Sequence, residues 1–174
     1  MKKFLKFILT VAIILGLAWF LRAFVIQPYQ IPSASMETTI MTNDIVIAEK
    51  VSYYFREPAA GDIVTFEDPE VPNRTLIKRV IATGGQTVNL IDGRVYVDGV
   101  AIDEPYTNGQ KSYPYEKSEG ITYPYTVPEG YVWVMGDNRT NSKDSRYFGA
   151  IKVSSINGRG CFIYWPLDQV GVLN

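Results

Sequence analysis

Two serine hydroxyls that lie one residue apart are the side chains best suited to nucleophilic chemistry. They occur in the sequence Pro32-Ser33-Ala34-Ser35-Met36. A serine hydroxyl is a weak nucleophile until a neighbouring group takes its proton. The chain contains no histidine, so every Ser–His and Cys–His arrangement is excluded and the base must be a lysine or a carboxylate. Serines beside a proline are also typical of an ordinary turn, and the motif by itself does not decide between the two interpretations.

The strongest candidate for the base is Lys78. It lies in the segment Thr75–Ile81, where strand alternation would put Leu76, Lys78 and Val80 on one face. An amine between two aliphatic neighbours is desolvated, which lowers its pKa and favours the neutral form near pH 7. Arg79 would point to the other face, and its positive charge would also favour neutral Lys78. An edge-strand lysine that discourages sheet aggregation would show the same local pattern.

A second dense group of polar side chains fills residues Gly136–Arg146. The segment directly follows the apolar run Tyr131–Met135 and carries charges of both signs, hydroxyls and amides. Such a loop can position a base through hydrogen bonds and ion pairs. An ordinary solvated loop rich in turn-forming residues has a similar composition. The pattern therefore leaves open a support for the base and a plain surface loop.

Composition narrows the other classes of function. The net charge of −1 gives no indication of nucleic acid as a partner. Cys161 is the single cysteine, so no intrachain disulfide can form, and its apolar surroundings in Cys161–Trp165 predict a small buried hydrophobe. The missing histidine also disfavours most zinc sites. We expect neither a metal nor an organic cofactor.

An apolar N-terminal segment would hold these groups at a membrane. Phe4–Phe24 has the length of about 20 residues that spans a bilayer as a helix. Lys2, Lys3 and Lys6 lie at its start, and basic flanks stay on the cytoplasmic side. We expect a retained anchor, with the bulk of the chain on the outer side of the membrane.

Two alternatives exist for this segment. A cleaved signal peptide would use the small residues of Gly16-Leu17-Ala18, but the apolar run continues through Trp19, Phe20 and Leu21 without a polar region before the cut. A buried helix of a soluble core should show a polar face, and this segment shows none.

The rest of the chain is predicted to be mainly β. Asp92-Gly93 and Asp98-Gly99 between short β-prone runs are strong hairpin signals. Glu104–Pro128 holds four prolines and five tyrosines, and we expect it to be irregular. No long amphipathic helical period follows the anchor. The predicted strands are Val25–Ile31, Asp44–Glu49 (buried on both faces), Asp62–Phe66, Thr75–Ala82, Thr87–Ile91, Arg94–Val97, Val100–Ile102, Tyr131–Met135 and Asn157–Tyr164.

Four motifs in this order resemble those of the bacterial type I signal peptidases, the membrane-anchored Ser–Lys proteases that remove secretory signal peptides. One such motif is modest evidence, but the ordered set behind an N-terminal anchor is specific. The motifs are Pro32–Met36 (similar to the nucleophile box), Gly61–Phe66 (a strand box), Ile77–Val80 (the lysine box) and Gly136–Gly149 (the last box).

The resemblance implies roles for individual residues. Ser35 would be the nucleophile and Lys78 the general base. The side chain of Ser33 and the backbone N–H of Ser35 would form the oxyanion hole, and Ser142 would hydrogen-bond and orient the Lys78 amine. The supporting ion pairs would be Asp144 with Arg146 and Asp137 with Arg79. Pockets for small residues at the first and third positions before the cut would be lined by Ile31, Pro32, Met36, Ile40, Leu76 and Ile77.

The resemblance also implies an architecture. It is a coiled β-sheet Ser–Lys protease core with a small inserted β subdomain, preceded by one transmembrane helix. Residues 1–26 would form the cytoplasmic tip and anchor, and residues 27–174 the extracytoplasmic catalytic domain, with the insertion at about 84–128. We expect a single-pass, monomeric protein of the plasma membrane with a cytoplasmic N-terminus. Its partners would be secretory preproteins, cut after small residues of the Ala-x-Ala type, and membrane lipid.

The chain departs from the family pattern at three places. Glu37–Ile40 follows the nucleophile box where a proline and Thr-Leu are usual. Thr140 stands where an aspartate is usual, and Thr83–Gln86 replaces a Leu-Pro-Gly-Asp turn. These departures remove no catalytic group and bear on local rigidity and substrate preference.

Three other functions compete with the peptidase. A self-cleaving repressor-type Ser–Lys protease has a similar β core, but the anchor and the lack of a DNA-binding helical domain disfavour it. A catalytically silent assembly factor on the same fold, such as a pilus-associated chaperone, would be signalled by loss of the serine or the lysine, and both are present. A membrane-anchored β adaptor would have no reason to combine a Ser-x-Ser-Met motif, a strand lysine and the polar loop.

Overall fold

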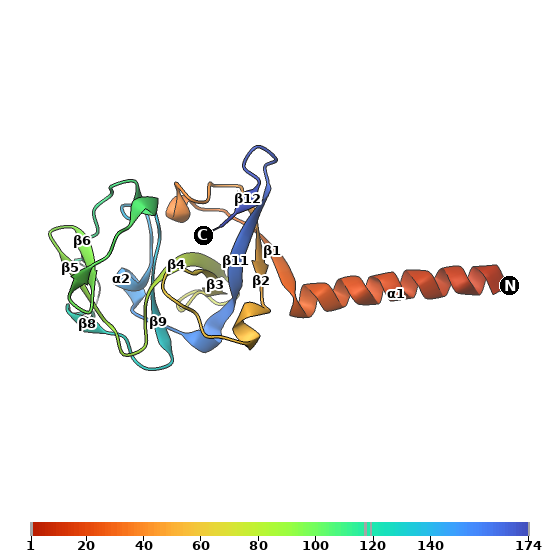
Figure 1. Cartoon of the computed structure of the whole chain (residues 1–174), viewed down its shortest axis with the longest axis horizontal. Coiled ribbons are helices and arrows are strands. Elements are labelled where there is room, and N and C mark those ends of the chain that lie inside the picture. The colour runs from red at the N-terminus through yellow and green to blue at the C-terminus, as the bar shows by residue number, and fades with distance from the viewer. Residues whose placement is uncertain (1, 117, 119, 174) are drawn as a thin grey trace.

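A long helix, α1 (Lys2–Phe24), projects away from a body built of β-strands (Figure 1). The computed structural model describes residues 2–116, 118 and 120–173. Met1, Lys117, Glu119 and Asn174, which belong to the two predicted domains, lie outside the described residues.

The body leaves the side chains of helix α1 uncovered. None of its residues is buried, and its apolar side chains face outward all round. By length and composition it could cross a membrane, and no other helix in the described ranges could. A core helix of a soluble protein would be covered by other elements, so that alternative is wrong. Pro28 lies in the strand that follows α1, as expected from a residue that cannot continue a helix.

Most of the body is one antiparallel sheet of eight strands, which confirms the mainly β prediction. Strands that are distant in sequence lie side by side in it, because β11 inserts between β2 and β3. In order across the sheet, the strands are β1 (Ile26–Gln30), β2 (Ile45–Glu49), β11 (Ile156–Trp165), β3 (Ile63–Glu67), β4 (Thr75–Thr83), β9 (Tyr131–Met135) and β10 (Ile151–Lys152), and β12 (Gly171–Val172) pairs with β11.

A second, four-stranded sheet lies at the end of the molecule away from α1 (Figure 1). Asp92 and Asp98 both have φ of 51°, and each is followed by a glycine with positive φ. Asp-Gly pairs take this backbone in tight hairpin turns, so both predicted hairpins are confirmed. The strands are β7 (Val100–Ala101), β6 (Arg94–Val97), β5 (Thr87–Ile91) and β8 (Tyr125–Thr126).

Strand β4 lies inside the main sheet, between β3 and β9, and both of its faces are covered. Its residues Ile77, Val80 and Ile81 belong to three different core clusters. Lys78 is opposite Val64 of β3 and is 2% exposed. The interpretation of Lys78 as an edge-strand lysine is therefore wrong, and its predicted desolvation is confirmed.

The structure corrects two local predictions. The segment predicted as a loop from Gly136 to Gly149 contains a short helix, α2 (Ser145–Phe148), because the Asp144 side chain caps it by accepting the N–H of Arg146. Strand β2 is buried on one face only, since its residues alternate between buried and half-buried. The described residues also form four 3-10 helices: η1 (Ala34–Met36), η2 (Ser52–Tyr54), η3 (Pro105–Thr107) and η4 (Val153–Ser155).

Candidate active site

Lys78 and Ser35 form a direct hydrogen bond. The Nζ of Lys78 donates to the Oγ of Ser35 at 2.7 Å and to the carbonyl oxygen of Ile77 at 2.7 Å. Both partners are buried, with Ser35 6% and Lys78 2% exposed. The strand thus brings the predicted base into hydrogen-bonding contact with the predicted nucleophile, which is the geometry that proton transfer requires.

Burial makes this amine a weaker base than an ordinary lysine. It lowers the pKa of Lys78 from 10.5 to about 8, although the carboxylates of Asp144 and Asp137 act in the opposite direction. With a pKa of about 8, roughly one amine in ten is neutral at pH 7. The charge of Arg79, which was expected to favour neutral Lys78, is balanced by the carboxylate of Asp137. Desolvation is therefore the main cause of the low pKa.

The nucleophile lies in the short 3-10 helix η1, packed on β4. The N–H groups of a first helical turn have no acceptor earlier in the helix, which leaves the Ser35 N–H suited to bind an anion. The Ser33 Oγ is 3.4 Å from the Ser35 Oγ and is exposed. The Ser33 hydroxyl, one of the two predicted oxyanion-hole groups, thus lies beside the nucleophile.

Two residues that the sequence analysis left without a role fix this turn. Asn138 donates its backbone N–H to the Ser35 carbonyl at 3.1 Å and its side-chain amide to the Ala34 carbonyl at 3.0 Å. Thr39 donates to the Asp137 carboxylate at 2.5 Å. Asn138 lies in the last motif and Thr39 just after the nucleophile box, but their partners are about 100 residues away, so spacing gave no signal of these contacts.

The two predicted ion pairs are present and buried. Arg79 donates to Asp137 at 2.9 and 2.8 Å. Arg146 donates to Asp144 at 2.9 and 2.8 Å, and Asp144 also accepts the N–H of Gly136 at 3.0 Å. These pairs connect β4, the polar loop and α2. The solvated-loop alternative for Gly136–Arg146 is therefore wrong.

The predicted hydrogen bond between Ser142 and Lys78 is not formed. The Ser142 hydroxyl is buried and has no hydrogen-bond partner among the described residues. It nevertheless lies beside the nucleophile, because a Cβ added at Gly136 would collide with both the Ser142 Oγ and the Ser35 carbonyl. In the structure the Lys78 amine donates to Ser35 and to Ile77 instead.

A small, mainly apolar pocket opens beside Ser33 and Lys78 and encloses about 180 Å³. Met36 and Ile40, which were predicted to line such a pocket, do not reach its surface. Both are fully buried in a core cluster, packed against aliphatic side chains of the main sheet. Four of the predicted substrate-binding residues do line the pocket: Ile31, Pro32, Leu76 and Ile77.

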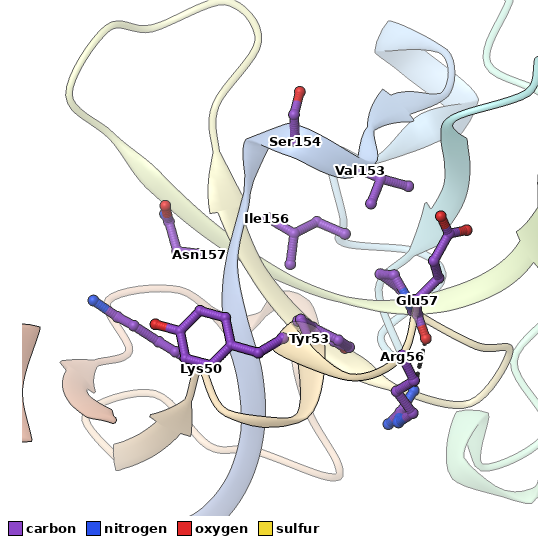
Figure 2. Close-up of a pocket in the computed structure, with 10 residues that line it drawn as sticks. Lys50, Tyr53, Arg56, Glu57, Val153, Ser154, Ile156 and Asn157 are labelled. Atoms are coloured by element: carbon purple, nitrogen blue, oxygen red, sulfur yellow. Dashed lines mark hydrogen bonds between the residues drawn. The ribbon is translucent and has the colours of Figure 1, made fainter. Parts of the chain in front are cut away.

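Figure 2 shows a second pocket, of about 350 Å³, which contains none of the predicted site residues. Val153 and Ile156 lie on one side of it, and Tyr53 and Arg56 lie on the other. It holds no serine–lysine contact, so we do not consider it the reaction site. Across the described ranges, no group of three or more Asp, Glu and Cys side chains is arranged to hold a metal ion.

A β-sheet body that holds a desolvated lysine against a serine hydroxyl has the features of a Ser–Lys hydrolase. Comparison with known proteins is more specific. Residues 4–165 match the family described as "Signal peptidase, peptidase S26". The chain therefore belongs to the signal peptidase family, peptidase S26.

Relatives from several lineages agree with this assignment. Probable signal peptidase I-1 of Synechocystis sp. is 40% identical over 173 residues, covering 95% of this chain and 84% of that protein. Thylakoidal processing peptidase 1, chloroplastic, of Arabidopsis thaliana is 38% identical over 86% of this chain, which spans only 45% of the plant protein's length. The crystal structure of a signal peptidase I from Enterococcus faecalis superposes with a TM-score of 0.52 and 35% identity, covering 60% of this chain and 97% of that chain.

Proposed function

We propose that Ser35 and Lys78 are the catalytic dyad with which this member of the family removes signal peptides from preproteins. The observation that carries the proposal is the 2.7 Å hydrogen bond between the buried Lys78 amine and the Ser35 hydroxyl. A catalytically silent assembly factor would have no use for a desolvated amine in this contact. No feature of the described residues favours that alternative over the peptidase.

In the first step, neutral Lys78 accepts the Ser35 proton while the Ser35 oxygen attacks the carbonyl carbon of the scissile peptide bond. The oxyanion is stabilised by the Ser33 hydroxyl and the Ser35 N–H, and one such donor is worth about 10²–10³ in rate. Lys78 then gives the proton to the leaving amine, which yields an acyl-enzyme and the new N-terminus. Lys78 then takes a proton from water as the water oxygen attacks the ester, and it returns that proton to the Ser35 oxygen as the ester bond breaks and the signal peptide's carboxylate is released.

The pocket beside the dyad supports a preference for small side chains before the cut. All substrate side chains that enter the pocket must fit together into its volume of about 180 Å³. Aliphatic side chains of Ile31, Leu76 and Ile77 supply apolar walls. An alanine methyl group suits such a shallow apolar site better than a bulky or charged side chain.

We propose that α1 anchors the protein in the plasma membrane with the N-terminus in the cytoplasm. The anchor and tip would be residues 1–26, and the extracytoplasmic catalytic domain residues 27–174, with the smaller sheet as the insertion at about 84–128. Lys2, Lys3 and Lys6 support the orientation. We expect the protein to act as a monomer.

Lipid contact would occur around η2, next to the end of α1. The Tyr54 hydroxyl donates to the carbonyl oxygen of Phe24 at 3.0 Å, and the Lys50 amine donates to that of Ala23 at 3.1 Å. Phe55 is 86% exposed beside them, as suits a side chain at a membrane interface. Tyr53 differs from the other two aromatic residues, because it packs on a core cluster and donates to Asp62.

The test is cleavage of a preprotein by the full-length protein in detergent, with the product's new N-terminus determined by mass spectrometry. We expect cleavage after a small residue, and no cleavage by Ser35→Ala. Ser154→Ala, which changes an exposed serine in the second pocket, is the matched control and should be fully active. Product formation by Ser35→Ala would refute Ser35 as the nucleophile.

A further inference from the structure

The segment that joins β7 to β8 has no part in the reaction described above. Its first portion, Glu104–Tyr115, which we call the strap, contains η3 and belongs to none of the four motifs. Figure 1 shows this portion in green next to the smaller sheet. Its side chains extend to the polar loop Gly136–Arg146, and three of these contacts involve buried or site-supporting groups.

The first contact is with Arg139, which is charged and almost fully buried. Its guanidinium donates to the two carboxylate oxygens of Glu104 at 3.1 and 2.5 Å and to the Ser112 hydroxyl at 2.6 Å. Its Nε donates to the Gly136 carbonyl at 2.8 Å. A buried charge that loses its partner is strongly destabilising. The strap therefore supplies the counter-charge without which the loop could not keep Arg139 inside.

The second contact is made by the aromatic ring of Tyr106. The guanidinium carbon of Arg79 lies 4.0 Å from its centroid, and that of Arg139 lies 5.8 Å from it. The Tyr106 hydroxyl donates to Glu104 at 3.2 Å. The strap thus covers the Arg79–Asp137 ion pair next to the catalytic strand.

The third contact is made by Tyr115, which touches the loop next to the dyad. Its hydroxyl donates to the backbone carbonyl of Ser142. Its ring packs against Arg146, 4.9 Å from the guanidinium carbon, and edge-on against Tyr147, with 6.2 Å between the centroids. Together these contacts fix the main chain of Ser142.

These contacts hold the Ser142 hydroxyl in its position near the dyad. The hydroxyl is buried without a hydrogen-bond partner among the described residues, an arrangement that costs free energy and calls for an explanation. When Lys78 takes the proton of Ser35, its amine becomes an ammonium with three donors. The Ser35 oxygen is by then bonded to the substrate and is a poorer acceptor. The ammonium needs a replacement acceptor nearby.

Building on the proposed dyad, we propose that the strap is a positioning element and that Tyr115 is its key residue. Tyr115 holds Ser142 so that its unpartnered hydroxyl can accept from the Lys78 ammonium during the reaction. Tyr115 does not touch the reacting atoms, so its effect passes through Ser142.

A double-mutant cycle between Tyr115 and Ser142 in the full-length protein tests this proposal. Tyr115→Phe keeps the ring and removes the hydroxyl. We expect it to lower kcat about 10-fold, the usual effect of one lost hydrogen bond, with KM within about 2-fold. In a Ser142→Ala background, the same substitution should lower kcat no further, because the group it positions is gone. Tyr113→Phe, at an exposed tyrosine of the same strap, is the matched control and should leave kcat unchanged.

Three results would overturn the proposal: wild-type kcat in Tyr115→Phe, an equal loss in the Ser142→Ala background, or a loss explained by unfolding at the assay temperature. Ser35→Ala is assayed alongside. If Ser35→Ala is inactive and Tyr115→Phe is unaffected, only the strap proposal fails. If Ser35→Ala remains active, the proposed dyad itself is wrong.

Discussion

The Nζ of Lys78 lies 2.7 Å from the Oγ of Ser35, although the two residues are 43 positions apart in the chain. The lysine comes from the middle of an internal strand and the serine from a 3-10 turn packed on that strand. The contact places an amine where water cannot solvate its charge. The same burial that lowers the pKa of the base also fixes it against the nucleophile.

Activity should depend on the protonation of Lys78. Its pKa is lowered to about 8, and only the neutral amine can accept the Ser35 proton. The value of kcat/KM should therefore increase about tenfold per pH unit below pH 8 and level off above it. Initial rates on a fixed preprotein from pH 6 to pH 9.5 measure this profile. A flat profile over that range would exclude a lysine base.

Lys78→Met should abolish activity and yet stabilise the fold at neutral pH. The pKa of Lys78 is lower in the folded chain than its ordinary 10.5, which corresponds to about 3 kcal/mol of destabilisation below pH 8. Methionine fills similar space without charge but forfeits two hydrogen bonds, each worth about 1 kcal/mol. The melting temperature at pH 7 should increase by about 2–4 °C.

The pH dependence of the stabilisation in Lys78→Met shows whether the buried charge is its cause. The wild type becomes more stable as pH rises from about 8 to 10.5, because its folded form then binds fewer protons than its unfolded form. The advantage of Lys78→Met should therefore disappear by about pH 10. Exposed Lys152→Met is the control. A gain that persisted unchanged to pH 10 would show that charge burial is not its cause.

Gly136→Ala should be nearly inactive. A Cβ at this position collides with the Ser142 hydroxyl and with the carbonyl oxygen of Ser35. Either group must move, and displacement of a reacting group by about 1 Å can cost roughly 10²-fold in rate. Single-turnover cleavage measures the loss. Gly16→Ala, with nothing within 4 Å of the added methyl group, is the control. Equal rates for the two variants would show that the loop can move to accommodate the methyl group at position 136.

Asp137→Ala should reduce the free energy of unfolding by about 3–5 kcal/mol, because it removes the carboxylate that pairs with buried Arg79. Glu70→Ala breaks the exposed ion pair with Lys143 and should cost less than about 1 kcal/mol. Urea unfolding of the two variants compares these costs. Similar values for both would mean that the Arg79–Asp137 pair does not support the site.

Much of the fold could be predicted from the sequence, because the patterns that indicate its helix and hairpins are local. Apolar length predicted α1, the Asp-Gly pairs predicted the hairpins, and the missing histidine restricted the base to a lysine or a carboxylate. Helix α2 was not predicted, because a single turn of helix has no periodicity to detect. The signal that could have indicated it is Asp144, a favourable N-cap residue directly before the helix.

The errors at the site concern contacts between distant segments. Whether Ser142 bonds to Lys78 depends on which acceptors surround the amine. In the structure, the amine donates to the Ser35 hydroxyl and to the Ile77 carbonyl. Met36 and Ile40 were assigned to the pocket by position, whereas both side chains pack into the core of the main sheet. The contact between Tyr115 and Ser142 joins residues of two loops that are far apart in the sequence, and no spacing rule predicts it.

The proposed role of Lys78 is to activate Ser35. It is tested most directly by comparing kcat of Lys78→Ala with that of Lys152→Ala on the same preprotein in detergent, after circular dichroism has shown that both are folded. Lys152 is exposed and lies outside the site, so its variant should match the wild type. This role predicts that kcat of Lys78→Ala falls about 10⁴-fold or more, the scale of losing a general base together with the nucleophile it activates. Cleavage by Lys78→Ala at a rate close to that of Lys152→Ala would contradict it.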